Sequence, residues 1–222
     1  MKIIARIHND FDSKFGIPRQ SNVVQELPGR IVFEPEYRNE AALRGIEGFD
    51  YLWLIWQFSQ AVRDKWSPTV RPPILGGNTR VGVFATRSPF RPNAIGLSSV
   101  KLEKVELHTP EGPVLHIRGA DLMNGTPILD IKPYLAYVDS HPEAAQGFRG
   151  QGWKRKLQVN FPPELLAKIP PEKQAGLLGV LENDPRPTYQ EDAQRIYGMS
   201  FGGQEIKFQV SDGILQVVAI EG

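Results

Sequence analysis

Short runs in which apolar and polar residues alternate dominate the chain as far as Tyr137, and this spacing is typical of β-strands. Clusters of glycine, proline, asparagine and aspartate separate the runs, which predicts that most neighbouring strands are joined as hairpins. The predicted strands are Ile3–His8, Arg30–Glu34, Phe49–Phe58, Arg80–Ala85, Ile95–Leu107, Val114–Arg118 and Ile128–Pro133. About seven strands connected in this way predict a closed or nearly closed antiparallel β-barrel.

Two stretches depart from simple alternation. Pro35–Arg44 has a proline near its start and is followed by Gly45, which predicts a short helix with a glycine C-cap. Phe49–Phe58 is apolar and aromatic almost throughout, which predicts a strand buried on both faces or nearly so, with its tryptophans in the core. Ser59 and Gln60 then place polar groups at the end of this buried element.

The pattern changes at Leu157, after a polar stretch rich in glycine. Helices are predicted at Glu164–Lys168 and Glu172–Asn183, because Pro170 and Pro171 separate two helical patterns. Strands are predicted at Arg195–Phe201, Gln204–Val210 and Leu215–Ile220. The predicted fold class is therefore mainly β: an N-terminal antiparallel β-barrel at residues 1–140, a linker at 141–156, and a small α+β domain at 157–222.

One segment has a composition that folding alone does not require. From Lys65 to Leu102 the chain contains no Asp or Glu, and we call this the acid-free segment. Its cations are Lys65, Arg71, Arg80, Arg87, Arg91 and Lys101. Such charges repel one another unless an anion binds. Prolines and glycines shape the backbone around them, and the loop at Thr86–Asn93 is rich in hydrogen-bond donors, which favours a ligand site over a merely solvated arginine-rich hairpin.

Composition and missing motifs exclude several other classes. The chain has 222 residues, a net charge of +1 and no cysteine, so disulfides, thiolate metal sites and a cysteine nucleophile are absent. No apolar run is long enough to span a membrane, and the N-terminus becomes polar too early for a signal sequence, so we expect a cytoplasmic protein. No dinucleotide-binding fingerprint, P-loop, zinc-protease motif or nucleophile elbow is present, and no metal is expected.

Several motifs together resemble the TrmO family, the tRNA (N6-threonylcarbamoyladenosine) N6-methyltransferases. They are VRPPILGGNTRVGVFATRSPFRPNAIGLSSVKL, FGIPRQS, GIEGFDYLWLIWQF, ADLMNGTPILDIKPY and DPRPTY, and the resemblance covers essentially the whole chain. It implies a non-Rossmann β-barrel methyltransferase that binds S-adenosylmethionine, and a homodimer with the cofactor close to the subunit interface. The implied substrate is threonylcarbamoyl-modified adenosine beside the anticodon, typically in a threonine tRNA.

The same resemblance implies a set of site residues. The cofactor pocket would draw on Pro18, Arg19, Gln20, Ser59, Gln60, Arg87, Ser88, Asp121, Leu122, Met123 and Asn124. Ser59 stands where many relatives are expected to have histidine, so only a backbone contact is expected to be retained there. Arg19 or Arg87 is expected to hold the methionine carboxylate, because guanidinium groups pair with carboxylates through two parallel hydrogen bonds.

The substrate side carries the remaining expectations. The N6 nitrogen of the modified base is a poor nucleophile while protonated, so a base should help, and Asp121, Asp130 and Tyr137 are candidates. The threonyl carboxylate needs a cation, which Arg91 or Arg186 would supply, and Tyr189 is expected to act beside Arg186. Contacts to tRNA phosphates are expected from Arg63, Lys65, Arg71, Lys154, Arg155 and Lys156.

Two alternatives share these features. A non-catalytic RNA-binding barrel would bind no cofactor in a saturable way. A methyltransferase that acts on a different RNA or on a small molecule would bind the cofactor, and its activity would not depend on the modified base.

Overall fold

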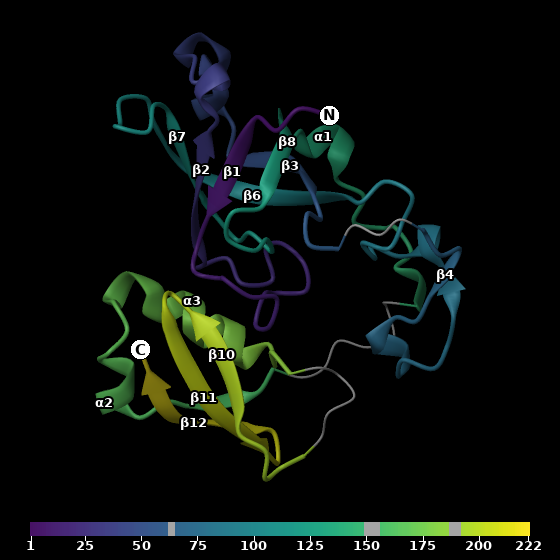
Figure 1. Ribbon diagram of the computed structural model, residues 1–222, viewed down its shortest axis with the longest axis vertical. Helices are drawn as coiled ribbons and strands as arrows, with labels where there is room; N and C mark the ends of the chain where they lie inside the picture. Colours follow the sequence, from purple (N-terminus) through teal and green to yellow (C-terminus); the bar gives the residue numbers. More distant parts are fainter. Residues whose placement is uncertain (62–64, 149–155, 187–191) are drawn as a thin grey trace.

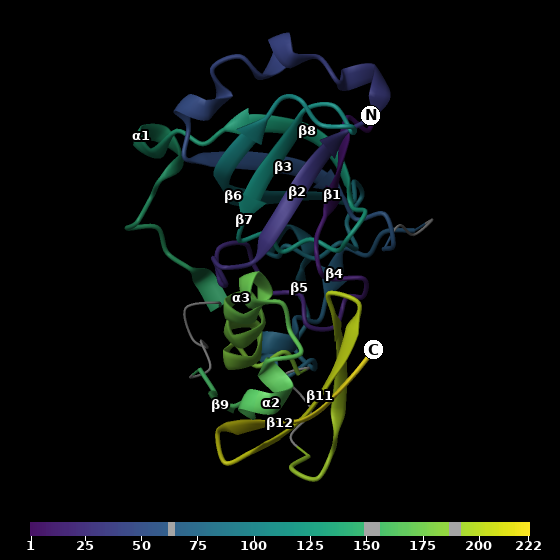
Figure 2. The same ribbon diagram turned by 90° about the vertical axis from the view of Figure 1, so that its left-hand side faces the viewer.

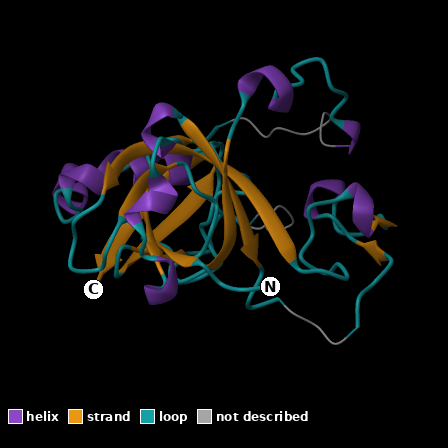
Figure 3. Ribbon diagram, turned by 90° about the horizontal axis from the view of Figure 1, so that it is seen from above, coloured by secondary structure: helices purple, strands orange, loops and turns teal. Residues whose placement is uncertain are grey.

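A computed structural model of the chain describes residues 1–61, 65–148, 156–186 and 192–222. Within these ranges, the larger part is a closed barrel of six strands in the order β1-β2-β7-β6-β3-β8 (Figure 1). Every pair of neighbouring strands in this barrel is antiparallel. The strands are β1 (Ala5–His8), β2 (Pro28–Phe33), β3 (Tyr51–Gln57), β6 (Ile95–Glu106), β7 (Val114–Arg118) and β8 (Pro127–Pro133). The predicted antiparallel barrel is confirmed, and Figure 3 shows its strands curving round a common interior.

Strand β3 shows how the barrel divides each strand into an inner and an outer face. Leu52, Leu54 and Trp56 are buried inside, while the intervening residues are only half-buried. The outward Trp53 donates its Nε1–H to a carboxylate oxygen of Asp139 over 2.8 Å. The strand was predicted to be buried on both faces or nearly so; its inner face is buried and its outer face is only half-buried, because a closed barrel offers one interior and nothing in the described chain covers the other side fully.

Two predicted elements take a different form. Residues 35–48 form three short 3-10 turns, η1 (Pro35–Tyr37), η2 (Glu40–Leu43) and η3 (Ile46–Gly48), instead of one helix. Leu43 is the one buried residue among these turns, so the segment has no apolar face that would hold a longer helix. The predicted strand at Arg80–Ala85 reduces to β5 (Val81–Gly82) and η5 (Val83–Ala85).

Strand β5 pairs with β4 (Thr69–Val70) in a small ribbon outside the barrel, and η4 (Pro73–Leu75) lies between them in sequence. Figure 1 shows this segment at the right, extending away from the barrel. We call residues 65–94 the arm.

The C-terminal part combines a four-stranded sheet, in the order β10-β11-β12-β9, with two helices. Its elements are β9 (Gln158–Asn160), α2 (Pro163–Leu166), α3 (Pro171–Glu182), β10 (Tyr197–Phe201), β11 (Gln204–Ser211) and β12 (Ile214–Glu221), and α1 (Ala136–Asp139) follows the barrel. The sequence did not predict β9, a short strand that pairs parallel with β12. Helix α3 buries Leu177, Val180 and Leu181 against the sheet strands. None of the described helices has both the length and the hydropathy needed to cross a membrane.

The loop between β1 and β2, residues 9–27, joins the two parts, and we call it the β1–β2 loop. Phe11, Val24 and Leu27 of this loop are buried in the same apolar cluster as Leu177 and Phe208 of the C-terminal part. Figure 2 shows the loop between the barrel and α3. A segment of the barrel sequence therefore completes the core of the C-terminal unit.

Candidate functional site

The site begins with a buried hydrogen-bond chain at one end of the barrel. Trp56 on β3 donates its Nε1–H to the Ser98 hydroxyl over 3.0 Å, and Ser98 on β6 donates to Asp121 Oδ1 over 2.6 Å. Ser98 is buried among apolar residues, so its hydroxyl needs both partners. The chain fixes the carboxylate of Asp121, which lies in the turn between β7 and β8, against the mouth of the barrel.

Glycine at position 96 makes this arrangement possible. Gly96 lies directly opposite Trp56 in the β3–β6 pairing. A Cβ atom at Gly96 would lie 2.2 Å from the indole ring, which is closer than atoms can approach. The indole therefore lies across β6, where its face contributes to the wall of the site.

The environment of Asp121 changes its acidity. Burial raises the pKa of Asp121, while the hydrogen bond from Ser98 and the positive charge of Arg87 partly oppose that rise. A backbone hydrogen bond from Ser21 acts in the same direction as Ser98. Since the net shift is upward, Asp121 is a stronger proton acceptor than an exposed aspartate.

Three arginines line the same cavity as this carboxylate, which has a volume of about 390 Å³ and which we call the arginine cavity. Its lining residues are Pro18, Arg19, Gln20, Trp56, Phe58, Thr86, Arg87, Arg91, Ile95, Gly96, Leu97 and Asp121. Arg87 donates to Gln20 Oε1, and Arg91 donates to the Thr86 carbonyl over 3.0 Å. Residues from the β1–β2 loop, the arm and the Asp121 turn are thus brought together at a positively charged pocket.

A second, mainly apolar cavity of about 170 Å³ adjoins the first, and we call it the aromatic cavity. It shares Trp56, Phe58 and Asp121 with the arginine cavity. Its other lining residues are Lys14, Ile17, Gln57, Ser59, Gln60, Ala61, Pro89, Leu122, Met123 and Thr126. The rings of Trp56 and Phe58 lie 4.2 Å apart between centroids, so together they form an aromatic wall.

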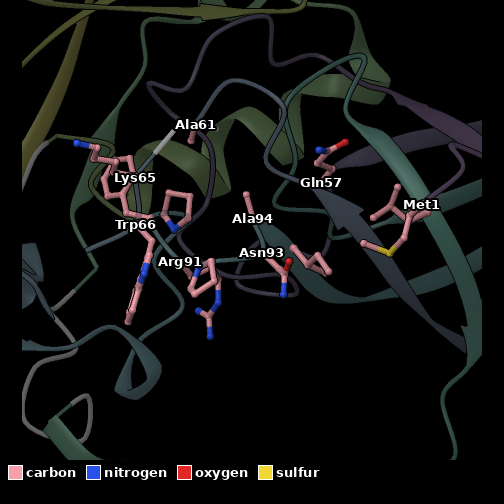
Figure 4. Close-up of a pocket in the computed structure, with 13 residues that line it drawn as sticks. Met1, Gln57, Ala61, Lys65, Trp66, Arg91, Asn93 and Ala94 are labelled. Atoms are coloured by element: carbon pink, nitrogen blue, oxygen red, sulfur yellow. The ribbon is translucent and has the colours of Figure 1, made fainter. Parts of the chain in front are cut away.

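A third cavity of about 230 Å³ opens beside these two, and we call it the outer cavity (Figure 4). Arg91 and Asn93 lie in its centre in this view, with Lys65 and Trp66 on one side and Gln57 on the other. It shares Gln57, Ala61 and Pro89 with the aromatic cavity, and Arg91 and Ile95 with the arginine cavity. The three cavities therefore adjoin one another and share parts of their walls.

Some predicted site residues support this site without lining it. The hydroxyl of Ser88 accepts a hydrogen bond from the Phe90 backbone, and the Ser88 carbonyl accepts one from Arg91. Asn124 donates to Asp12 over 2.9 Å and accepts from the Asn9 backbone, so it holds the β1–β2 loop.

Other predicted residues lie away from the three cavities. Tyr137 on α1 is 85% exposed, and Asp130 forms an ion pair with Lys132. Arg71 is exposed on the arm. Lys156 pairs with Glu182. Arg63, Lys154, Arg155 and Tyr189 lie outside the described residues.

The guanidinium of Arg186 is paired with Asp184, two residues before it in the chain. Its Nε and Nη2 donate to the two carboxylate oxygens of Asp184 over 2.8 and 2.9 Å, and both side chains are nearly buried. Hydrogen bonding to Asp184 raises the pKa of Arg186. Its backbone carbonyl accepts a hydrogen bond from Arg19. Arg186 therefore positions the β1–β2 loop, and its guanidinium is already paired.

Sequence reasoning missed several residues of the site. Ser98 was available as a signal, because a serine in an apolar strand needs a partner. Trp56 was predicted as core, and it is buried, but its ring also lines two cavities. Thr86, Phe58 and Trp66 were not singled out, since only the folded arrangement brings them to the same pocket. Among the described residues, no cluster of three or more acidic or histidine side chains could hold a metal ion.

Two family models match the chain. The tRNA-methyltransferase O N-terminal domain matches residues 6–140, and the TrmO C-terminal domain matches residues 154–222. The tRNA (adenine(37)-N6)-methyltransferase of Escherichia coli K12 is 37% identical over 98% of this chain and 96% of the relative. A protein of the same name from Eikenella corrodens is 44% identical over 78% of this chain and 99% of the relative.

Solved structures agree with these matches. A crystal structure of TrmO superposes with a TM-score of 0.80 at 29% identity, covering 99% of this chain and 97% of the other. A TrmO crystal structure from Pseudomonas aeruginosa superposes with a TM-score of 0.79 at 30% identity, covering 99% and 95%. The likeness extends through both parts of the fold and includes the segments that form the three cavities. The chain therefore belongs to the tRNA-methyltransferase O family.

Proposed function

We propose that this protein transfers a methyl group from S-adenosylmethionine to N6 of threonylcarbamoyl-modified adenosine. The modified adenosine is at position 37, next to the anticodon, of a threonine tRNA. Membership of the tRNA-methyltransferase O family supports the reaction and the cofactor. So do relatives named tRNA (adenine(37)-N6)-methyltransferase and S-adenosylmethionine-dependent methyltransferase. The observation that carries the proposal is a group of adjoining cavities lined by Asp121, Arg19, Arg87 and Arg91.

The donor set of the site fits S-adenosylmethionine. The aromatic cavity presents Trp56, Phe58 and Leu122, whose apolar surfaces suit an adenine ring. In the adjoining arginine cavity, Arg19 and Arg87 suit the methionine carboxylate. When bound, this cofactor supplies an electrophilic methyl group on a sulfonium ion. The role of the protein is then to align the acceptor with that methyl group and to exclude water.

The outer cavity suits the acceptor base. It adjoins both other cavities, so a base held there would lie beside the methyl donor. Arg91 lines both the outer and the arginine cavity and would bind the threonyl carboxylate of the modified base. We prefer Arg91 to Arg186 for this role, because the Arg186 guanidinium is already paired with Asp184.

Asp121 is the base that the geometry favours. It lines the arginine and aromatic cavities, both of which adjoin the outer cavity where the acceptor base is placed, whereas Asp130 and Tyr137 line none of the three cavities. Burial raises the pKa of Asp121, which increases its affinity for the N6 proton. The hydrogen bond from Ser98 keeps the carboxylate oriented while it accepts that proton. Removing the proton makes N6 a better nucleophile.

We further propose that the enzyme works as a cytoplasmic homodimer with the cofactor near the subunit contact. Leu97, which lines the arginine cavity, is 53% exposed, and Tyr137 and Val138 are exposed on α1. A second copy covering such apolar side chains would also close the cofactor site. Light scattering of the purified protein measures the mass that this arrangement requires.

The test combines cofactor binding with nucleoside analysis. Calorimetry should detect saturable binding of S-adenosylmethionine, and Arg87→Ala should weaken it. Mass spectrometry of tRNA nucleosides should then detect methylation of tRNA that carries the threonylcarbamoyl group and none of unmodified tRNA. Absence of cofactor binding would favour a non-catalytic RNA-binding barrel. Methylation that ignores the threonylcarbamoyl group would favour a methyltransferase with a different substrate.

A further inference from the structure

Two large aromatic side chains on the arm are stacked in the open. Trp66 is 49% exposed and Phe84 is 71% exposed, yet their ring centroids lie 6.0 Å apart with an angle of 26° between the rings. Single exposed apolar residues are ordinary, but a stacked exposed pair forms a flat apolar surface that water covers poorly. We call this pair the aromatic platform.

The platform is built by the backbone of the arm. Strands β4 and β5 pair through Thr69 with Gly82 and Val70 with Val81. Just beyond this pairing, the Val83 amide donates to the Pro68 carbonyl over 2.9 Å. Trp66, which precedes β4, and Phe84, which follows β5, therefore lie at the same end of this antiparallel ribbon, and the pairing brings them together. Val83, between this ribbon and Phe84, is buried and anchors η5.

The platform lies on a segment that is rich in cations and has no acid from Lys65 to Leu102. The acid-free segment contains both aromatic residues, and its Lys65, Arg71 and Arg80 form no ion pair with another described residue. Arg80 instead donates to the hydroxyl and carbonyl of Thr69, which fixes its position without neutralising its charge. Proteins bind unpaired nucleotides by combining exposed aromatic faces with cations that contact the phosphate backbone, and this segment carries both.

The platform is also continuous with the site. Trp66 and Lys65 line the outer cavity together with Arg91 (Figure 4). A nucleotide next to the acceptor base would therefore pass over Trp66 if the acceptor base entered the outer cavity. Enzymes that modify a nucleobase take it out of its stack, which leaves the neighbouring bases without a stacking partner.

We propose that Trp66 and Phe84 stack with an unpaired base that flanks the acceptor adenosine in the anticodon loop, while Lys65, Arg71 and Arg80 contact the adjoining phosphates. This inference rests on the proposed function for the position of the acceptor base. It adds a second recognition site that reads the single-stranded loop around that base. The stacking contact is tolerant of sequence, since every base has an aromatic face.

The experiment measures RNA binding without turnover. Binding of an unmodified anticodon stem-loop RNA is measured by fluorescence anisotropy, with S-adenosylhomocysteine present. We expect Trp66→Ala and Phe84→Ala each to weaken binding by about 5- to 150-fold, the range of one lost stacking contact, and Trp66→Phe to retain most of it. Leu107→Ala is the matched control, because Leu107 is an exposed apolar residue beyond the far end of β6.

A double-mutant cycle identifies the stacked base. The stem-loop is prepared with an abasic nucleotide on either side of position 37, and each RNA is measured with wild-type protein and with Trp66→Ala. If a base stacks on Trp66, removing that base and removing Trp66 cost less together than the sum of the separate losses. Fully additive losses on both sides of position 37 would overturn the proposal.

Two further outcomes distinguish this proposal from a subunit contact and from the proposed methylation reaction. If Trp66→Ala dissociates a homodimer in light scattering and leaves stem-loop affinity unchanged, the platform is a subunit contact and the proposal is wrong. If stem-loop binding follows the expected pattern but tRNA carrying the threonylcarbamoyl group is not methylated, the platform stands and the proposed reaction fails.

Discussion

The β1–β2 loop and the arm both contribute to the site, but the structure holds them in opposite ways. The β1–β2 loop is packed from two sides: Phe11 is buried against Phe201, and the Asn22 amide donates to the Gly119 carbonyl of the barrel over 2.8 Å. The arm stands outside the barrel with two large aromatic side chains exposed. Under the proposed function, the comparison indicates that the part of the site built by the β1–β2 loop is preformed, whereas the exposed aromatic pair of the arm is left open for a ligand.

The largest expected effect comes from removing the packing of the β1–β2 loop. Phe11→Ala leaves a cavity in the shared core, so the free energy of unfolding should fall by about 3–5 kcal/mol, and the affinity for S-adenosylmethionine should fall with it. Urea unfolding followed by fluorescence and calorimetry measure the two quantities. Phe84→Ala on the arm is the matched control, since an exposed side chain should change stability by at most about 0.5 kcal/mol. Equal destabilisation by both variants would remove the contrast between the two regions.

A second prediction concerns Asp121, where the two regions meet. Ser21 of the β1–β2 loop donates to it, and Arg87 of the arm lies near it. Asp121→Asn should lower the methylation rate by about 10²- to 10⁴-fold in single-turnover measurements. Burial raises the pKa of Asp121, so this group becomes protonated at a higher pH than an exposed aspartate does. The wild-type methylation rate should therefore begin to fall at a higher pH as the solution is acidified. The rate of the Asp121→Asn variant should not show this pH-dependent fall. A larger loss with Asp130→Asn would show that the base is misassigned.

A third prediction tests how closely the loop approaches the C-terminal unit. Gly16 has a φ of +93°, and a Cβ atom there would lie 2.2 Å from the sulfur of Met199. Gly16→Ala should therefore destabilise the protein by about 1–3 kcal/mol through both backbone strain and the clash. Met199→Ala should relieve the clash, so the double variant should be more stable than the sum of the two single losses predicts. Strict additivity in urea unfolding would mean that the two residues do not meet.

The smallest expected effect belongs to the exposed end of the arm. Arg71→Ala should weaken tRNA binding roughly equally for every sequence and should reduce the salt dependence of log K by about 0.7–0.9, the value for one lost phosphate contact. Anisotropy titrations across a range of salt concentrations measure this slope. Arg30→Ala, on β2 and paired with Glu111, serves as the control that should leave the slope unchanged. An unaltered slope for Arg71→Ala would show that the arm does not follow the RNA backbone.

Local pattern was enough to predict much of this molecule. Alternation in β1, β6, β7 and β8 predicted strands, because the two faces of a strand impose a period of two on the sequence wherever it folds. The absence of acids between Lys65 and Leu102 predicted an anion-binding region before any contact was known, since charge composition does not depend on the fold. The family motifs identified Arg19, Arg87 and Asp121, which the fold brings to one cavity.

Tertiary structure decided what no local pattern contains. The hydrogen bonds that link Trp56, Ser98 and Asp121 join β3, β6 and the turn between β7 and β8. These elements are distant in sequence, so no residue spacing predicts the hydrogen bonds. The same holds for the β1–β2 loop, whose apolar residues fill the core of the C-terminal unit rather than that of the barrel. Periodicity determines which residues share a face, and long-range packing determines which faces meet. The sequence by itself therefore determined the elements and the charge of the site, while closure of the barrel and docking of the C-terminal unit decided its geometry.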